Sequence, residues 1–198
     1  RDRLRSRGLG DVYKRQICFV GMFAAITSVL SIITIPTPWG VPFTLQTFAI
    51  ALSGYVLGKI YGTFATLIYI ILGLIGVPVY AGMSAGAGVL AGPTGGYLWG
   101  FIIMTFFCGL AADFGNNAKG CIAKILISIL ALAGCHIPGI IQLKIVAGMS
   151  WPQAALLGTV PYLVKDILSM VAAYFIAAAV RKALRSADIL DWQKKTAA

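Results

Sequence analysis

The sequence predicts an all-α integral membrane protein with six transmembrane helices and both termini in the cytoplasm. Hydrophobic residues make up 59% and charged residues 11% of the 198 residues, whereas soluble domains contain about 45–50% apolar and about 25% charged residues. The net charge of +10 comes mainly from Lys and Arg near the two ends and in short connections. This distribution is typical of charged flanks around membrane spans and argues against a nucleic-acid partner.

The first three spans lie in the N-terminal half of the chain. Residues 17–35 form an apolar run of the length that a helix needs to cross a bilayer, which is about 20 residues. A neutral segment rich in Pro and Gly, residues 36–44, leads to the second run, residues 45–58, which is short and ends at Lys59. Residues 61–80 form the third run, and we expect the Gly-rich segment 81–96 to be a packed loop.

The last three spans follow this loop. Residues 97–112 form the fourth run, which is closed by polar residues between Asp113 and Lys119. Residues 121–148 form the fifth, in which Pro138-Gly139 predicts a kink. After a loop at 148–161, residues 163–180 form the sixth run, which ends at Arg181-Lys182.

The membrane domain is expected to comprise residues 17–184, between a basic leader at 1–16 and a cytoplasmic tail at 185–198. The leader has no apolar period and lacks the apolar core of a signal peptide. We therefore expect residues 1–16 to be a non-native extension, and we assign no function to them.

Loop charge predicts the orientation. The connections at Lys59, at 113–124 and after Arg181 hold nearly all Lys and Arg outside the leader, whereas those at 36–44, 81–96 and 149–162 hold none. The positive-inside rule then places both termini inside, with Lys144 as the one exception. Irregular backbone near membrane depth persists only where it is buried or lines a cavity. Three uncharged loops on the outer face therefore predict a capped pocket open to the exterior.

Residues for common catalytic and cofactor chemistry are missing from the sequence. His136 is the only histidine, which excludes His-cluster metal sites, and we interpret it as a hydrogen-bonded packing residue. The four cysteines lie in apolar runs without a CxxC pair. GxSxG and HExxH do not occur, and the glycines of GAGVLAGPTGG lack the GK[ST] of a phosphate loop. We expect no catalytic residue, no metal and no cofactor.

The pair Lys165-Asp166 lies in the first turns of the sixth span, just after Pro161. Ionisable residues at that depth are functional hypotheses by default. Neighbouring helical residues point about 100° apart, which argues against mutual neutralisation, although a neutralising pair that fixes helix packing is the structural alternative. We expect the ammonium to bind an anionic group and the carboxylate to accept from N–H donors. Ser169 shares a face with Lys165.

Small residues recur at four-residue spacing on the first span, in the pairs Gly21/Ala25 and Ala24/Ser28. Such pairs allow helices to approach closely. They predict either tight packing inside the bundle or a docking face for another membrane subunit.

The motifs GVPVYAGMSAGAGVLAGPTGGYLWGF and, before it, IPTPWGVPFTLQTFAIALSGYVLG resemble those of the BioY family. Its members are the biotin-specific membrane subunits of energy-coupling factor (ECF) transporters, and the resemblance covers residues 17–184. It implies six helices in a prokaryotic plasma membrane, with a biotin pocket near the outer face. It also implies a transmembrane coupling protein and two ATP-binding-cassette ATPases as partners, so that ATP binds only to those subunits.

The resemblance also implies site residues. Family members commonly carry an Asp followed three positions later by Lys, whereas here Asp166 is followed by Ser169 and preceded by Lys165. Candidate walls of the pocket are Tyr80, Tyr97, Trp99 and Tyr162, and candidate polar contacts are Thr44 and Gln46. The motif residues Gly92, Pro93, Thr94, Gly95 and Gly96 complete the expected substrate site. Gly21, Ala24, Ala25 and Ser28 match the positions that contact the coupling protein.

The function expected from the sequence is therefore biotin binding for ECF-driven uptake. A standalone channel or facilitator for another small solute is the alternative, although few ionisable residues exist to line a continuous polar path. A membrane-embedded enzyme is a third reading, which the missing catalytic groups disfavour.

Overall fold

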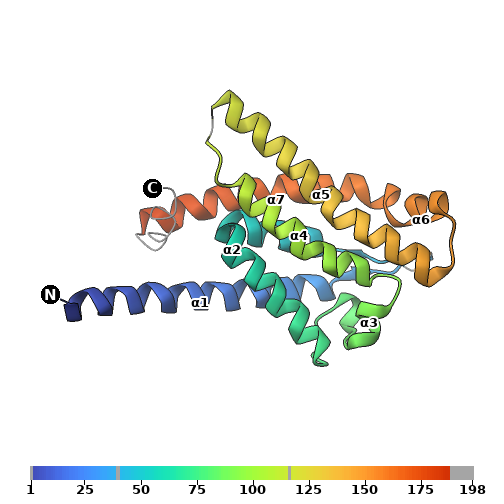
Figure 1. Ribbon diagram of the computed structural model, residues 1–198, viewed down its shortest axis with the longest axis horizontal. Helices are drawn as coiled ribbons and strands as arrows, with labels where there is room; N and C mark the ends of the chain where they lie inside the picture. Colours follow the sequence, from blue (N-terminus) through green and yellow to red (C-terminus); the bar gives the residue numbers. More distant parts are fainter. Residues whose placement is uncertain (1, 39–40, 116, 188–198) are drawn as a thin grey trace.

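The computed structural model describes residues 2–38, 41–115 and 117–187, and these residues are mainly helical (Figure 1). Four helices are long and apolar enough to cross a membrane. They are the stretch Tyr13–Ile32 of α1 (Asp2–Ile32), α2 (Gln46–Leu74), α5 (Ala118–Ala147) and α7 (Val160–Ser186). The shorter apolar helix α4 (Gly95–Ala111) lies between α2 and α5. The predicted all-α membrane class is confirmed.

The second and third predicted spans form the single element α2, which is broken at Gly58. Gly58 has φ 83° and ψ 177°, a conformation that is essentially restricted to glycine. The two arms approach each other closely beside the break, where a Cβ on Gly62 would lie 2.9 Å from the Cα of Gly54. Each arm is shorter than the roughly 20 residues of a full span.

The segments predicted as loops contain short regular elements. The first, residues 36–44, contains β2 (Phe43–Thr44), which pairs in antiparallel fashion with β1 (Thr34–Ile35) at the end of the first predicted span. The second contains the 3-10 turn η1 (Ala81–Met83) and α3 (Ala87–Ala91), and the third contains α6 (Trp151–Gly158). A capping box between Ser150 and Gln153 starts α6, because it satisfies backbone N–H groups of the first turn. The loop prediction was wrong for these residues.

Helix α5 corresponds to the fifth predicted run. It is helical from Ala118 to Ala147 across Pro138, so the fifth run is not broken there, and the kink expected at Pro138-Gly139 stays a prediction. The helix ends at Gly148, whose left-handed conformation (φ 64°) is a common C-terminal cap.

The two ends of the bundle differ in charge. One end carries β2, α3 and α6, which belong to the three segments without Lys or Arg, together with β1 (Figure 1). At the other end, Lys59 pairs with Asp113 at 3.3 Å. Arg181 donates to the backbone oxygens of Val56 (3.2 Å) and Ala112 (3.0 Å) there. The uncharged segments therefore meet at one end, as the sequence analysis expected.

Candidate functional site

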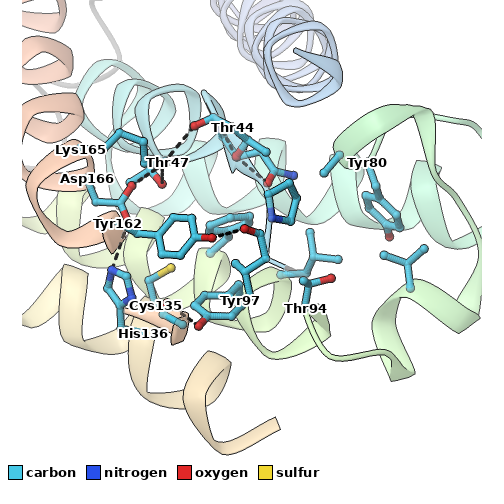
Figure 2. A pocket seen from close by; sticks show the side chains of 18 of the residues that line it. Thr44, Thr47, Tyr80, Thr94, Tyr97, Cys135, His136, Tyr162, Lys165 and Asp166 are labelled. Carbon is cyan, nitrogen blue, oxygen red and sulfur yellow. Dashed lines mark hydrogen bonds and ion pairs between the residues drawn. The ribbon is translucent and has the colours of Figure 1, made fainter. Parts of the chain in front are cut away.

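A cavity of about 160 Å³ lies at the uncharged end of the bundle (Figure 2). The segments that were expected to form a pocket supply most of its wall. Eight predicted site residues line it: Thr44, Gln46, Tyr80, Thr94, Tyr97, Tyr162, Lys165 and Asp166. In Figure 2, Lys165, Asp166 and His136 gather on one side, whereas Tyr80 and Thr94 lie on the other. The cavity therefore has a charged side and an uncharged polar side.

Lys165 and Asp166 form an ion pair at the start of α7. Lys165 Nζ lies 2.6 Å from Asp166 Oδ1 and donates to the backbone oxygen of Thr44 at 3.0 Å. The prediction that neighbouring helical positions keep the two groups apart was wrong. The four-carbon lysine side chain bridges the angle, and the carboxylate, which is only 4% exposed, needs a compensating cation.

His136 is the second partner of Asp166. Its Nε2 lies 3.2 Å from Asp166 Oδ2, and its Nδ1 lies 3.3 Å from the Thr159 hydroxyl. The sequence identified His136 as a hydrogen-bonded packing residue, which matches its burial but misses its place in the cavity wall. Asp166 thus lies between a cation on its own helix and an imidazole from α5.

Tyrosine rings form much of the apolar wall, and their hydroxyls are held by the backbone. Tyr97 donates to Gly158 O at 2.7 Å and Tyr80 donates to Ile70 O at 2.6 Å. Tyr162 donates to Val41 O and stacks at 4.6 Å on Phe43. Because these hydroxyls already have acceptors, the rings present mainly apolar surface to the cavity.

Thr44 and Gln46 add uncharged polar groups at the start of α2. The Thr44 hydroxyl donates to Gln46 Oε1 at 3.0 Å, and Gln46 Nε2 donates to the Tyr69 hydroxyl at 2.8 Å. These bonds fix the orientation of both side chains in the wall.

Six predicted substrate residues do not line the cavity: Trp99, Ser169, Gly92, Pro93, Gly95 and Gly96. Trp99 is 48% exposed, because two positions along a helix from Tyr97 correspond to about 200° of rotation. Ser169 lies one turn beyond Lys165, away from the start of α7. The structure therefore contradicts a direct cavity contact for these six residues.

Gly95 and Gly96 instead form the joint between α4 and its neighbours. A Cβ on Gly95 would lie 1.9 Å from Leu90 O, and one on Gly96 would lie 2.2 Å from Pro138 O. Gln142 closes the joint by donating to the backbone oxygens of Leu90 (2.6 Å) and Gly92 (2.8 Å). The joint sets how α4 enters the bundle and thus where Tyr97 lies.

The BioY family model matches residues 5–186, nearly the whole chain. The chain belongs to the BioY family. A relative, the biotin transporter BioY of Thermotoga maritima, is 41% identical over 168 residues, which cover 85% of this chain and 96% of the relative. The probable biotin transporter BioY of Pyrococcus horikoshii is 37% identical over 163 residues, covering 82% and 94%.

A solved structure shares the fold of this BioY-family chain. It is the crystal structure at 2.1 Å of the S-component for biotin from an ECF-type ABC transporter. The two chains superimpose with a TM-score of 0.75 at 24% identity, over 86% of this chain and 92% of that chain. The likeness establishes a common arrangement of helices.

Several lining residues of this BioY-family chain were missed by sequence reasoning. They are Val41, Pro42, Thr47, Ala81, Ser84, Val89, Leu98, Phe101, Cys135, His136 and Gly158. Most are apolar or small, so their composition does not distinguish them from packing residues. Thr47 had a usable signal, because it lies in the same PFTLQT motif as Thr44 and Gln46.

The small residues of α1 divide between two faces. Ala24 and Ser28 are buried, and Ser28 donates to Ala24 O at 2.8 Å. Gly21 and Ala25 are exposed. The predicted four-residue docking face is therefore wrong for Ala24 and Ser28, which match the packing alternative and leave Gly21 and Ala25 as docking candidates.

Proposed function

We propose that this chain is the biotin-binding membrane subunit of an ECF-type vitamin uptake transporter. The observation that carries the proposal is the cavity with a lysine at one side and tyrosine rings between that side and a neutral polar side. Biotin has matching chemistry: a carboxylate at one end, an apolar thioether ring, and a ureido group with N–H donors and a C=O. Relatives named as biotin transporters support the same ligand.

In the proposed complex, the Lys165 ammonium binds the carboxylate of biotin. The side chain is 24% exposed and already lies at the cavity wall, so a ligand oxygen can replace part of its contact with Asp166. Gln46 and Thr94 are proposed contacts for the ureido group, and Thr44, whose backbone oxygen accepts from Lys165 at 3.0 Å, is a proposed polar contact beside the carboxylate. In the opposite pose, the ureido N–H groups of biotin would donate to Asp166. Loss of the Lys165 ammonium would then weaken biotin and an analogue without the carboxylate equally.

The chain is proposed to lie in a prokaryotic plasma membrane with both termini inside and the cavity facing out. Counting the two arms of α2 separately gives the six proposed spans. The charged end with Lys59, Asp113 and Arg181 then faces the cytoplasm, in agreement with the positive-inside rule. A coupling protein and two ATP-binding-cassette ATPases are proposed to supply the energy, with ATP bound only to them and no cofactor on this chain.

The test is ligand binding by the purified chain alone. After purification without the coupling protein or ATPases, titration calorimetry should show saturable binding of one biotin per chain. No measurable binding of biotin would overturn the proposal. Rapid ATP-independent flux of biotin into liposomes that contain only this chain would support the channel alternative instead.

A further inference from the structure

Two further cavities lie along α5 and α7, and one of them shares His136 with the wall of the candidate biotin site. One is an apolar groove of about 740 Å³, and the other is a cavity of about 650 Å³ at the charged end of the bundle. Tyr55, Lys124 and Tyr174 line both. The two cavities therefore share part of their wall. Together they are called the composite site, with the groove as its apolar part and the other cavity as its charged part.

The apolar part is bordered by two facing helical stripes. From α5 come Cys121, Ile125, Ile129 and Leu132, and from α7 come Leu163, Ile167, Val171 and Phe175. The stripe on α7 is roughly 18 Å long at 1.5 Å per residue, close to one leaflet of a hydrocarbon core that is about 30 Å thick. Ile129 and Phe175 are 57% and 67% exposed. The dimensions suit a single acyl chain.

The charged part contains four basic residues and one acid. Lys124, Arg181, Lys182 and Arg185 line it together with Asp113, and Asp113 is paired with Lys59 at 3.3 Å. The bonds of Arg181 to Val56 O and Ala112 O fix its guanidinium at the cavity, and Lys124 Nζ donates to the Tyr174 hydroxyl at 3.1 Å. Basic pockets between helices at this depth favour phosphate groups.

We propose that this composite site binds one anionic phospholipid. Its phosphate lies among Arg181, Lys182 and Arg185, and one acyl chain follows the groove between α5 and α7. The charged part of the site carries more positive than negative charge. It therefore favours an anionic lipid over a zwitterionic one, because only the anionic lipid has a net charge to neutralise. Lys124, Tyr55 and Tyr174 line both parts of the site. They therefore lie where the headgroup of the lipid meets its acyl chain, a position that amphipathic side chains favour.

The test compares phosphatidylglycerol with phosphatidylcholine of the same acyl chains. The purified full chain is titrated with each lipid in detergent, and one-to-one adducts are counted by native mass spectrometry. Phosphatidylglycerol should be retained about tenfold more tightly. Equal retention of both lipids, or equal binding of glycerol phosphate without acyl chains, would overturn the proposal.

Two variants test the charged part and the groove separately. Lys182→Gln with Arg185→Gln should weaken phosphatidylglycerol about tenfold, whereas the matched control Lys14→Gln with Arg15→Gln, on exposed residues of α1, should not. Val171→Trp should fill the groove and lower retention, whereas Ile176→Trp, which is equally exposed outside the groove, should not. If a control variant lost phosphatidylglycerol as strongly as its test variant, the proposed site would be contradicted.

Two further measurements show whether each variant is folded and whether the coupling protein, rather than a lipid, occupies the groove. Each variant must keep the thermal unfolding midpoint of the wild type in lipid-free detergent, so that lost adducts report binding. In the assembled transporter, a cysteine introduced by Val171→Cys should not crosslink to the coupling protein. Efficient crosslinking there would assign the groove to that protein and overturn the lipid assignment.

Discussion

Asp166 is the residue on which the charged side of the cavity depends. Its carboxylate is 4% exposed and lies between Lys165 Nζ at 2.6 Å and His136 Nε2 at 3.2 Å. A buried carboxylate is tolerated only with such compensation. The charge of Asp166 is therefore compensated within the chain, and the proposed anionic ligand would compete with Asp166 for the ammonium of Lys165.

Replacing Lys165 with Ala should weaken biotin binding by roughly ten- to hundredfold, because a hydrogen bond to a charged group contributes about 1.5–3 kcal/mol. An analogue with an alcohol in place of the carboxylate should lose much less. Titration calorimetry with both ligands measures the difference.

Lys144→Ala is the control for that experiment, because Lys144 lies 4.7 Å over the Trp151 ring and outside the cavity. It should leave both affinities unchanged. Equal losses for biotin and the alcohol on Lys165→Ala would refute the carboxylate role and favour the pose with the ureido group on Asp166.

The Lys165–Asp166 and Lys59–Asp113 ion pairs should differ in their contribution to stability. Asp166→Ala removes the buried carboxylate, which is 5% exposed, from its pair with Lys165, and removing one partner of a buried pair costs about 3–5 kcal/mol. The side chains of Lys59 and Asp113 are 38% and 46% exposed, and such pairs contribute about 0–1 kcal/mol. Asp166→Ala should lower the unfolding midpoint by roughly 6 °C or more, and Asp113→Ala by less than about 4 °C. Similar decreases of the unfolding midpoint for the two variants would show that the buried ion pair contributes no more to stability than the exposed one.

At the scale of elements, the joint between α4 and α5 positions the cavity wall. Gly96→Ala places a Cβ where Pro138 O lies 2.2 Å away, and overpacking of this kind costs about 1–3 kcal/mol. We expect a lower unfolding midpoint together with weaker biotin binding, because Tyr97 follows directly in α4.

Gly88→Ala in α3 is the matched control, since a Cβ there meets nothing within 4 Å. Thermal unfolding and biotin affinity should both remain close to wild type. If Gly96→Ala is equally harmless, the joint does not determine the position of Tyr97.

Sequence reasoning located the long elements better than the short ones. Apolar runs at 121–148 and 163–180 are visible because lipid-facing and core-facing positions are both apolar in a membrane helix. Helix α6 cannot be recognised from a long apolar run, because it is short and its start depends on a capping box of Ser150 and Gln153. The break in α2 at Gly58 lies where the sequence analysis ended its second run, because a glycine beside Lys59 interrupts the apolar pattern there.

At the scale of the whole molecule, α1 presents two faces with different roles. Ala24 and Ser28 pack inward, whereas Gly21 and Ala25 are exposed. Ala25→Leu should therefore abolish ATP-driven biotin uptake by the assembled transporter and leave the affinity of the isolated chain unchanged, because the added bulk separates α1 from the proposed coupling protein.

Ala147→Leu, also at an exposed position, controls for added bulk and should transport normally. Uptake assays in proteoliposomes and titration of the isolated chain provide the two measurements. Loss of biotin binding by Ala25→Leu would mean that this face serves packing within the bundle.

The candidate site was predictable where its chemistry is unusual for a membrane span. Lys165 and Asp166 stand out because charge is expensive there, and tyrosines next to uncharged loops were reasonable wall candidates. Phe101, Leu98 and Cys135 were not predictable, because a cavity wall and a packed core use the same apolar residues. Trp99 was predicted as a wall residue because it shares a motif with Tyr97. Two helical positions correspond to about 200° of rotation, so Trp99 does not line the cavity.

His136 lines both the candidate biotin cavity and the apolar groove between α5 and α7. One imidazole thus separates the proposed biotin site from the side of the bundle that the groove opens on. We expect the dissociation rate of biotin to depend on the lipid or detergent in that groove as well as on the polypeptide. Affinities of variants are then comparable only when they are measured in one lipid composition.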